Sequence, residues 1–242
     1  MPAIVKTIFA NLMSSKGIDE RGRLFRAPQR QPSALFFVYV VLFYGAWIAW
    51  PYLVYPRLVS IGEHSLSYAL IHIGLRLLIW VVPVFAYLRS VERVEPLGYL
   101  RLTRHVGRGV TIGLLVTALN VAGSIARFGL PHPSMARITW NSMLGTSFFV
   151  GFIEEIPYRG FMLQQIESRS RFWTANLLSS VLFVGIHLPG WIALHQLSTD
   201  RVVTIFVFGV VMAVVFKYSG SLWAAIVAHS ANDFLSFVLF GR

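Results

Sequence analysis

The chain consists largely of long apolar stretches separated by short polar ones. A helix that spans a membrane needs roughly 17 to 25 mainly apolar residues. Stretches that meet or approach this length occupy residues 34–55, 67–88, 109–125, 139–166, 172–188, 202–218 and 221–240. The pattern predicts an all-α fold, a polytopic transmembrane bundle of about seven helices.

Arginine and lysine are concentrated in alternate connecting segments of this pattern. Short loops that are rich in these residues usually remain in the cytoplasm. The basic segments precede the first span, join the second to the third, follow the fourth and end the sixth; they contain Lys6, Lys16, Arg21, Arg23, Arg26, Arg30, Arg89, Arg93, Arg101, Arg104, Arg108, Arg169, Arg171 and Lys217. We therefore predict a multi-pass protein of the plasma (inner) membrane of a bacterial-type cell, with a cytoplasmic amino terminus and an external carboxyl terminus.

Residues 1–33 form a cytoplasmic amino-terminal segment in this scheme. They lack the compact charged, apolar and cleavage regions of a signal peptide. Several apolar residues fall on one helical face, namely Ile4, Val5, Ile8, Phe9, Leu12 and Met13. Such a face is typical of a helix that lies along the membrane surface. A disordered tail is an equal alternative.

Composition narrows the classes of function. The chain is 56% hydrophobic and 13% charged, which leaves no room for a large aqueous domain. Its formal net charge is +11, but the basic residues are spread over the loops as topology signals. We therefore expect the lipid bilayer as a partner and no nucleic acid. The absence of cysteine excludes disulfides, thiolate metal sites and cysteine nucleophiles.

Two carboxylates and a guanidinium interrupt the fourth apolar stretch, in the sequence Glu154-Glu155-Ile156-Pro157-Tyr158-Arg159-Gly160. Charges at this depth are costly, so they indicate a functional site. Helical spacing places Glu155 and Arg159 within reach of each other. Glu154 is then a surplus acid, which a catalytic or ligand role would explain. Pro157 should distort the helix, and Gly160 should admit a close neighbour.

Polar residues also lie within two later stretches. His187 follows Phe183 by one turn, and the helix is expected to end at Pro189. His229 and Asp233 are again four residues apart. At about 1.5 Å per residue from the cytoplasmic helix ends, Glu154, His187 and His229 lie roughly 18, 22 and 12 Å deep. These depths predict one buried site that is reached from the cytoplasmic side.

The second stretch carries His72 and Arg76 one turn apart. They could face a cavity or a neighbouring helix, and we interpret them as structural.

Three ordered motifs resemble the CPBP family of intramembrane proteases, which includes the Rce1-type CAAX prenyl endopeptidases and bacterial relatives linked to bacteriocin processing and immunity. Residues 154–159 resemble its EExxxR element, 183–187 its FxxxH element, and 229–233 its HxxxN/D element. The resemblance covers about residues 140–240. It divides the chain into residues 34–138, the amino-terminal transmembrane helices, and residues 139–242, the catalytic helices.

The resemblance implies an intramembrane endopeptidase that cleaves a membrane-associated peptide or protein, such as a prenylated CAAX or leader peptide. Glu154 and His187 would activate a water molecule, while His229 and the residue at 233 would stabilise the oxyanion. Glu155 and Arg159 would support the motif helix. Because many family members carry asparagine at the last position, Asp233 could instead orient His229 or ligate a metal.

A metal cofactor such as zinc stays open at this point. Glu154, Glu155, His187, His229 and Asp233 could supply three ligands and a water position. The spacing is not the compact HExxH arrangement, and a glutamate–histidine pair can activate water alone, which favours a metal-free reaction.

Two other functions fit the same residues. A proton-coupled transporter would use buried carboxylates and histidines as a relay, but it would need a polar path to both faces. A catalytically silent family member could act as a scaffold or immunity protein.

Overall fold

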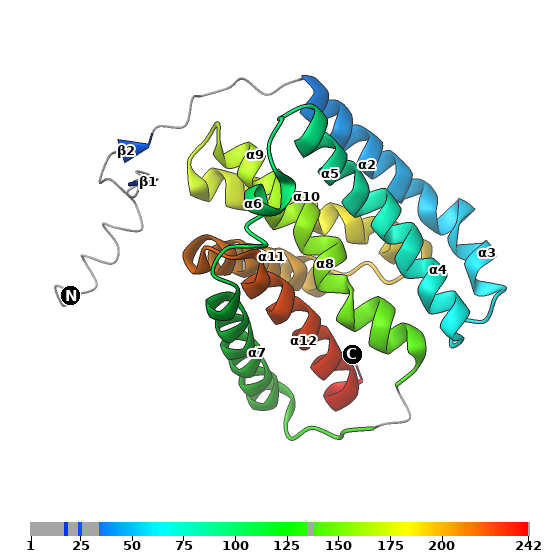
Figure 1. Ribbon diagram of the computed structural model, residues 1–242. Coiled ribbons are helices and arrows are strands. Elements are labelled where there is room, and N and C mark those ends of the chain that lie inside the picture. The colour runs from blue at the N-terminus through cyan, green and yellow to red at the C-terminus, as the bar shows by residue number, and fades with distance from the viewer. Residues whose placement is uncertain (1–16, 19–23, 26–33, 135–137, 242) are drawn as a thin grey trace.

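The computed structural model describes residues 17–18, 24–25, 34–134 and 138–241. The surface helix predicted within residues 1–33 lies outside the described residues. Two very short strands, β1 (Gly17–Ile18) and β2 (Leu24–Phe25), pair antiparallel with each other. All other regular structure in the described chain is helical (Figure 1).

Among the described residues, six helices are long and apolar enough to cross a membrane. They are α2 (Ala34–Leu53), the continuous run of α4 (Leu66–Arg76), η1 (Leu77–Val81) and α5 (Val82–Ser90), then α7 (Val106–Phe128), α10 (Phe172–Ala193), α11 (Thr199–Ser219) and α12 (Leu222–Phe240). This result confirms the predicted all-α, polytopic bundle. Two short helices, α3 (Tyr55–Val59) and α6 (Pro96–Tyr99), lie in the connections.

The fourth predicted span is helical but is not one regular α-helix. It is divided into η3 (Asn141–Phe148), α8 (Val150–Glu155), η4 (Ile156–Met162) and α9 (Leu163–Glu167), where η denotes a π-helix. A turn at Phe149 separates η3 from α8. Pro157 has no backbone N–H to donate, and the wider π-helix begins beside it, as the predicted distortion requires. The irregular backbone thus surrounds the two motif carboxylates.

The predicted end of the fifth span is wrong. α10 continues through Pro189 and ends at Ala193, five residues beyond the predicted boundary at 188. A proline inside a membrane helix is tolerated when neighbouring groups satisfy the backbone that it disturbs. The Trp47 indole of α2 donates to the carbonyl oxygen of Ile186 at 2.6 Å, just before this turn. His187 therefore lies in the middle of a helix.

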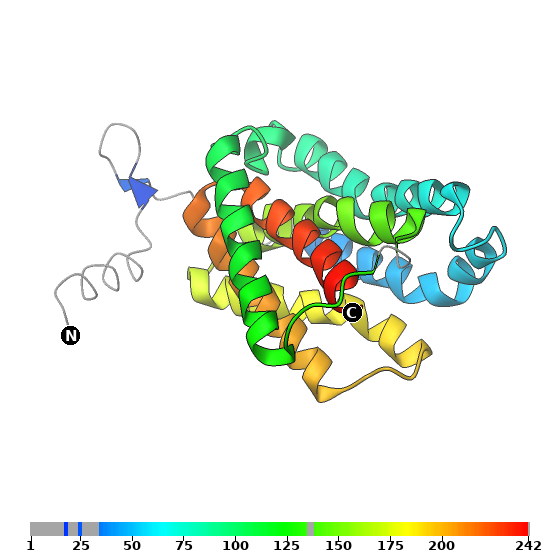
Figure 2. The ribbon, with the colours of Figure 1, turned by 90° about the horizontal axis from the view of Figure 1, so that it is seen from below.

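The helices pack around α12. It lies between α7 on one side and the η3–α8 run on the other, and it also contacts α11 (Figure 1). Figure 2 shows α3 and α4 on the far side of the bundle from α7. α8 contacts η1 from the amino-terminal half and α12 from the carboxyl-terminal half, so residues from both halves of the chain meet near α8.

An aromatic cluster joins these two halves. Phe43 of α2 packs edge-on against Trp80 of η1, with ring centroids 5.0 Å apart. Tyr158 of η4 contacts Phe183 of α10 at 5.1 Å and exchanges a hydrogen bond of 2.9 Å with Tyr44. Each such ring pair contributes about 0.5–1.5 kcal/mol beyond its buried area. The cluster holds η4 and α10, which flank the site, in a defined position.

Candidate active site

Glu155 forms the ion pair that helical spacing predicted. Arg159 Nη1 donates to Glu155 Oε1 at 2.9 Å, and both side chains are buried. The same guanidinium donates through Nη2 to the Gly209 carbonyl at 3.2 Å and lies 4.2 Å from the centroid of the Phe183 ring. His229 Nδ1 approaches the same Glu155 oxygen at 2.7 Å. Glu155 therefore ties η4, α11 and α12 together through two basic side chains.

Glu154 is not a surplus acid, which corrects the sequence-based expectation. Arg76 Nη2 donates to Glu154 Oε1 at 2.7 Å, and both side chains are less than one-tenth exposed. The two carboxylates of the motif are thus balanced by two guanidinium groups. Arg76, which the sequence placed towards a cavity or a neighbouring helix, thus contacts the motif helix. Its partner lies 78 positions away on another helix, beyond the reach of helical spacing rules.

The second oxygen of Glu154 has a different environment. Glu154 Oε2 lies 3.9 Å from His229 Nε2, which is too long for a hydrogen bond. His229 Nε2 also lies 3.6 Å from Asp233 Oδ2. His229 therefore faces three carboxylates, those of Glu154, Glu155 and Asp233.

His187 is oriented by the backbone of its own helix. Its Nδ1 lies 2.9 Å from the Phe183 carbonyl oxygen, which can only accept a hydrogen bond. Nδ1 must therefore carry the proton, and Nε2 of a neutral ring is left as the basic nitrogen. The Phe183 ring packs against the imidazole at 5.1 Å. The FxxxH spacing thus positions the ring and selects its tautomer.

The predicted site residues meet at one cavity of about 1050 Å³. Glu154 from α8, His187 from α10, and His229 and Asp233 from α12 all line it. Residues from all three motifs therefore border one cavity. Glu155 and Arg159 lie behind this wall, consistent with a supporting position.

The cavity opens at the end that the sequence did not predict. Its lining extends to Arg127 at the end of α7, Asp200 at the start of α11 and Phe240 at the end of α12. Arg127 and Asp200 are mostly exposed and lie 3.6 Å apart. These helix ends lie opposite the basic loops. The prediction that the site is reached from the side of the basic loops is therefore wrong. The estimated depths of Glu154, His187 and His229 show that the three residues lie at a similar level, but they do not show at which end of the helices the cavity is open.

A hydrogen-bonded chain of amides joins α7 to the site. Asn120 donates to the side-chain oxygen of Asn232, and Asn232 Nδ2 donates to Asp233 Oδ1 at 3.3 Å. Asn120 belongs to the amino-terminal half, and the sequence analysis did not place it at the site. A polar residue inside an apolar span was the only signal of its role.

A family comparison bears on the same helices. Residues 136–235 match the model of the family described as type II CAAX prenyl endopeptidase Rce1-like. This region of the chain is therefore similar to the Rce1-like family. The match contains all three motifs and confirms the resemblance on which they were interpreted. No curated protein and no solved structure matches the chain.

The similarity to the Rce1-like family indicates the general class of the protein. The matched family is described as one of CAAX prenyl endopeptidases, which suggests a protease, and the apolar helices suggest a multi-pass membrane protein. A bilayer and a peptide substrate are its expected partners. The helices from α2 to α7, including those that carry Arg76 and Asn120, lie outside the matched residues.

One oxygen of each motif glutamate in this Rce1-like region is engaged with protein partners. Glu154 Oε1 binds Arg76, and Glu155 Oε1 binds Arg159 and His229. Within the described residues, no three histidine or carboxylate side chains are grouped in a way that could hold a metal ion. This arrangement does not fit the ligand set of Glu154, His187, His229 and Asp233 that the sequence left open.

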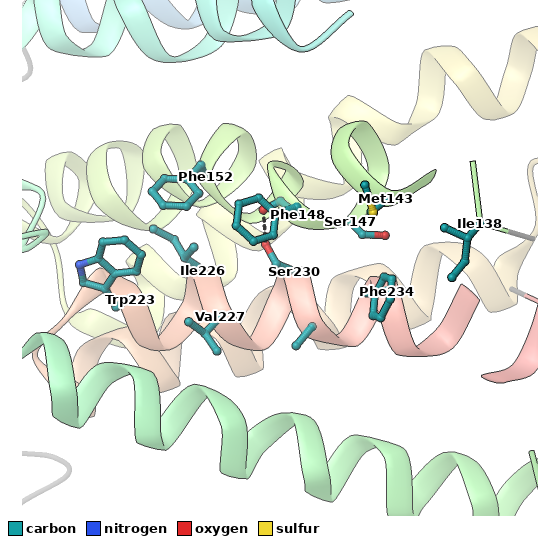
Figure 3. Close-up of a pocket in the computed structure, with 11 residues that line it drawn as sticks. Ile138, Met143, Ser147, Phe148, Phe152, Trp223, Ile226, Val227, Ser230 and Phe234 are labelled. Atoms are coloured by element: carbon teal, nitrogen blue, oxygen red, sulfur yellow. Dashed lines mark hydrogen bonds between the residues drawn. The ribbon is translucent and has the colours of Figure 1, made fainter. Parts of the chain in front are cut away.

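The other face of α12 in the Rce1-like region is apolar. It borders a pocket of about 430 Å³ that includes Phe148, Phe152 and Trp223 (Figure 3). Ser230 lies on this face of α12. Its hydroxyl donates to the Phe148 carbonyl at 3.0 Å and accepts from the Gly151 N–H at 3.2 Å. Ser230 thereby fastens α12 to the turn where η3 ends and α8 begins, which sets the distance between His229 and the motif glutamates.

Proposed function

We propose that the protein is an intramembrane endopeptidase that hydrolyses a peptide bond with water activated by Glu154 and His187. The observation that supports this most strongly is that both side chains line one cavity together with His229. The substrate that we propose is a membrane-associated peptide or protein segment, including a prenylated CAAX peptide or a leader peptide.

The size of the cavity suits an extended peptide. Its lining on α12 runs from His229 to Phe240, a helical distance of about 16 Å at about 1.5 Å per residue. An extended chain advances about 3.3–3.6 Å per residue, so four to five residues span that length. Most of the cavity surface is apolar, although the polar side chains of the site line part of it. Such a lining suits a hydrophobic peptide segment.

The two proton-accepting atoms in the proposed reaction are Glu154 Oε2 and His187 Nε2. Arg76 occupies the other oxygen of Glu154, and the Phe183 carbonyl occupies the other nitrogen of His187. A water molecule between these atoms loses a proton to Glu154 as its oxygen attacks the scissile carbonyl carbon. General-base assistance of this kind contributes about 10²- to 10⁴-fold to a rate.

The remaining steps return the proton. The negative oxygen of the tetrahedral intermediate is stabilised by the Nε2–H of His229 when that ring is positively charged, and Asp233 orients the ring. The carboxylic acid of Glu154 then donates the proton to the amide nitrogen as the carbon–nitrogen bond breaks. The products are a new carboxyl terminus and a new amine, and Glu154 is ionised again.

Cleavage by purified protein tests this proposal. Wild type, Glu154→Gln and His187→Asn would be compared in detergent with a peptide library that includes farnesylated CAAX peptides. Lys217→Met is a matched control, because Lys217 pairs with Glu167 at a helix end away from the site. We expect each site variant to lose at least about 10²-fold in kcat, as loss of a general base requires. Unchanged cleavage by Glu154→Gln would refute the proposal.

A further inference from the structure

Arg76 is the most unusual charged residue outside the three motifs. It ends α4, it is 6% exposed, and it lies outside the residues that match the family. A buried guanidinium in an apolar helix is costly unless its environment compensates for the lost hydration. Arg76 receives this compensation from two tryptophan rings and from the carboxylate of Glu154.

Two tryptophans hold the guanidinium in place. Its carbon lies 5.2 Å from the centroid of the Trp80 ring and 5.8 Å from that of Trp47. Cation–π contacts of this kind are strongest when they are shielded from water. Trp47 also donates to the carbonyl of Ile186, the residue before His187. The same indole therefore contacts Arg76 and fixes the helix that carries the catalytic histidine.

The contact between Arg76 and Glu154 uses one arm of the guanidinium. A structural arginine–carboxylate pair is frequently bidentate, which occupies both oxygens. Here Nη2 binds Oε1, while Nε of Arg76 has no hydrogen-bond partner within the described part of the chain. Glu154 Oε2 is 3.9 Å from Nε2 of His229, and the hydrogen bond that Arg76 donates within the described chain goes to Oε1. The pair thus anchors one oxygen and leaves the other available.

We infer that Arg76 is a positioning residue for hydrolysis, which holds Glu154 by Oε1 so that Oε2 faces the attacking water. This inference rests on the proposed function. The amino-terminal helices α2 and α4 and the η1 segment therefore contribute directly to the site, although the family motifs lie elsewhere. A carboxylate without this anchor would rotate about its terminal bond, and the fraction of molecules with the productive geometry would fall.

Arg76→Met and Arg76→Lys test this inference. Methionine keeps an apolar chain between the tryptophans but donates nothing to Glu154, whereas lysine retains one charged donor. We expect Arg76→Met to lower kcat at least about tenfold with KM within about twofold of wild type, the pattern of an interaction that acts in the transition state. Arg76→Lys should recover at least about half of the lost activity, because the native contact is one-armed. Lys217→Met serves as the control and should match wild type.

Activity must be expressed per folded molecule, because removal of a buried charge also lowers stability. The folded fraction would be measured by size-exclusion chromatography and thermal unfolding of each variant. A kcat of Arg76→Met within twofold of wild type per folded molecule would overturn the inference. So would an effect confined to KM, or no recovery with lysine.

Failure of this inference is distinguishable from failure of the proposed function. If wild type cleaves and Glu154→Gln does not, while Arg76→Met retains full kcat, only the inference about Arg76 is lost. If wild type cleaves no peptide, or Glu154→Gln cleaves normally, the proposed function fails and this inference fails with it.

Discussion

Replacing Arg159 with methionine should destabilise the protein far more than replacing a half-buried lysine of another ion pair. Arg159 is 1% exposed and donates to Glu155 and to the Gly209 carbonyl. Without it, the Glu155 carboxylate keeps only His229 as a partner, since Glu155 Oε2 already lacks one within the described chain. Removing one partner of a buried pair costs about 3–5 kcal/mol because a buried charge is left uncompensated.

The control is Lys217→Met. Lys217 pairs with Glu167, and these side chains are 36% and 21% exposed. Exposed pairs contribute about 0.2–1 kcal/mol. The two variants should therefore differ by at least about 2 kcal/mol in the free energy of unfolding, which is more than tenfold in the equilibrium constant.

The assay is reversible unfolding in mixed micelles with increasing sodium dodecyl sulfate, followed by tryptophan fluorescence. The double variant Arg159→Met, Glu155→Gln completes a mutant cycle and should regain part of the loss, because it removes the uncompensated charge. Equal stability of Arg159→Met and Lys217→Met, within about 0.5 kcal/mol, would refute the reasoning.

Two further predictions concern the chemistry and the packing of the site. Peptide cleavage should persist after dialysis against a chelator, because one oxygen of each motif glutamate already binds a guanidinium group and no three described histidine or carboxylate side chains are placed to hold a metal ion; loss of activity on dialysis and its return with zinc would contradict this. Gly151→Ala should abolish cleavage and lower stability, because its Cβ would lie 2.5 Å from the Ile226 carbonyl oxygen and from Ser230 Oγ, whereas Gly45→Ala has nothing within 4 Å and should behave as wild type. Near-normal activity of Gly151→Ala would show that α8 and α12 can separate without harm.

Local patterns were sufficient to predict much of the site. The Glu155–Arg159 pair follows from a spacing of four residues, and the structure confirms it. The close approach at Gly160 is also confirmed, since a Cβ there would lie 2.8 Å from a methyl group of Leu100. These features depend only on helical geometry within one segment, which the sequence determines directly.

Features that depend on packing between distant helices could not be predicted in this way. The pairing of Glu154 with Arg76 and the amide contact between Asn120 and Asn232 each join residues from different helices. Helical spacing states which residues share a face, but it does not state which helix covers that face. The continuation of α10 through Pro189 has the same origin, because a neighbouring tryptophan supports the backbone there.

The direction of access to the site was wrong for a related reason. Loop charges indicate which helix ends share a side of the membrane, but the open part of a cavity depends on where helices diverge. Here the lining reaches Arg127 and Asp200, at the ends away from the basic loops. The side of the membrane on which Arg127 and Asp200 lie can be determined by replacing each with cysteine and labelling it from either side of sealed vesicles.

The central claim is that Glu154 and His187 act on one water molecule. The most direct measurement is therefore kcat for Glu154→Gln, His187→Asn and the double variant with one cleavable peptide, normalised to folded protein. Groups that act as a unit are strongly non-additive. The account predicts that the double variant is no more than a few-fold slower than the slower single variant. Losses that multiply, or a single variant with wild-type kcat, would show that the two residues do not share the step.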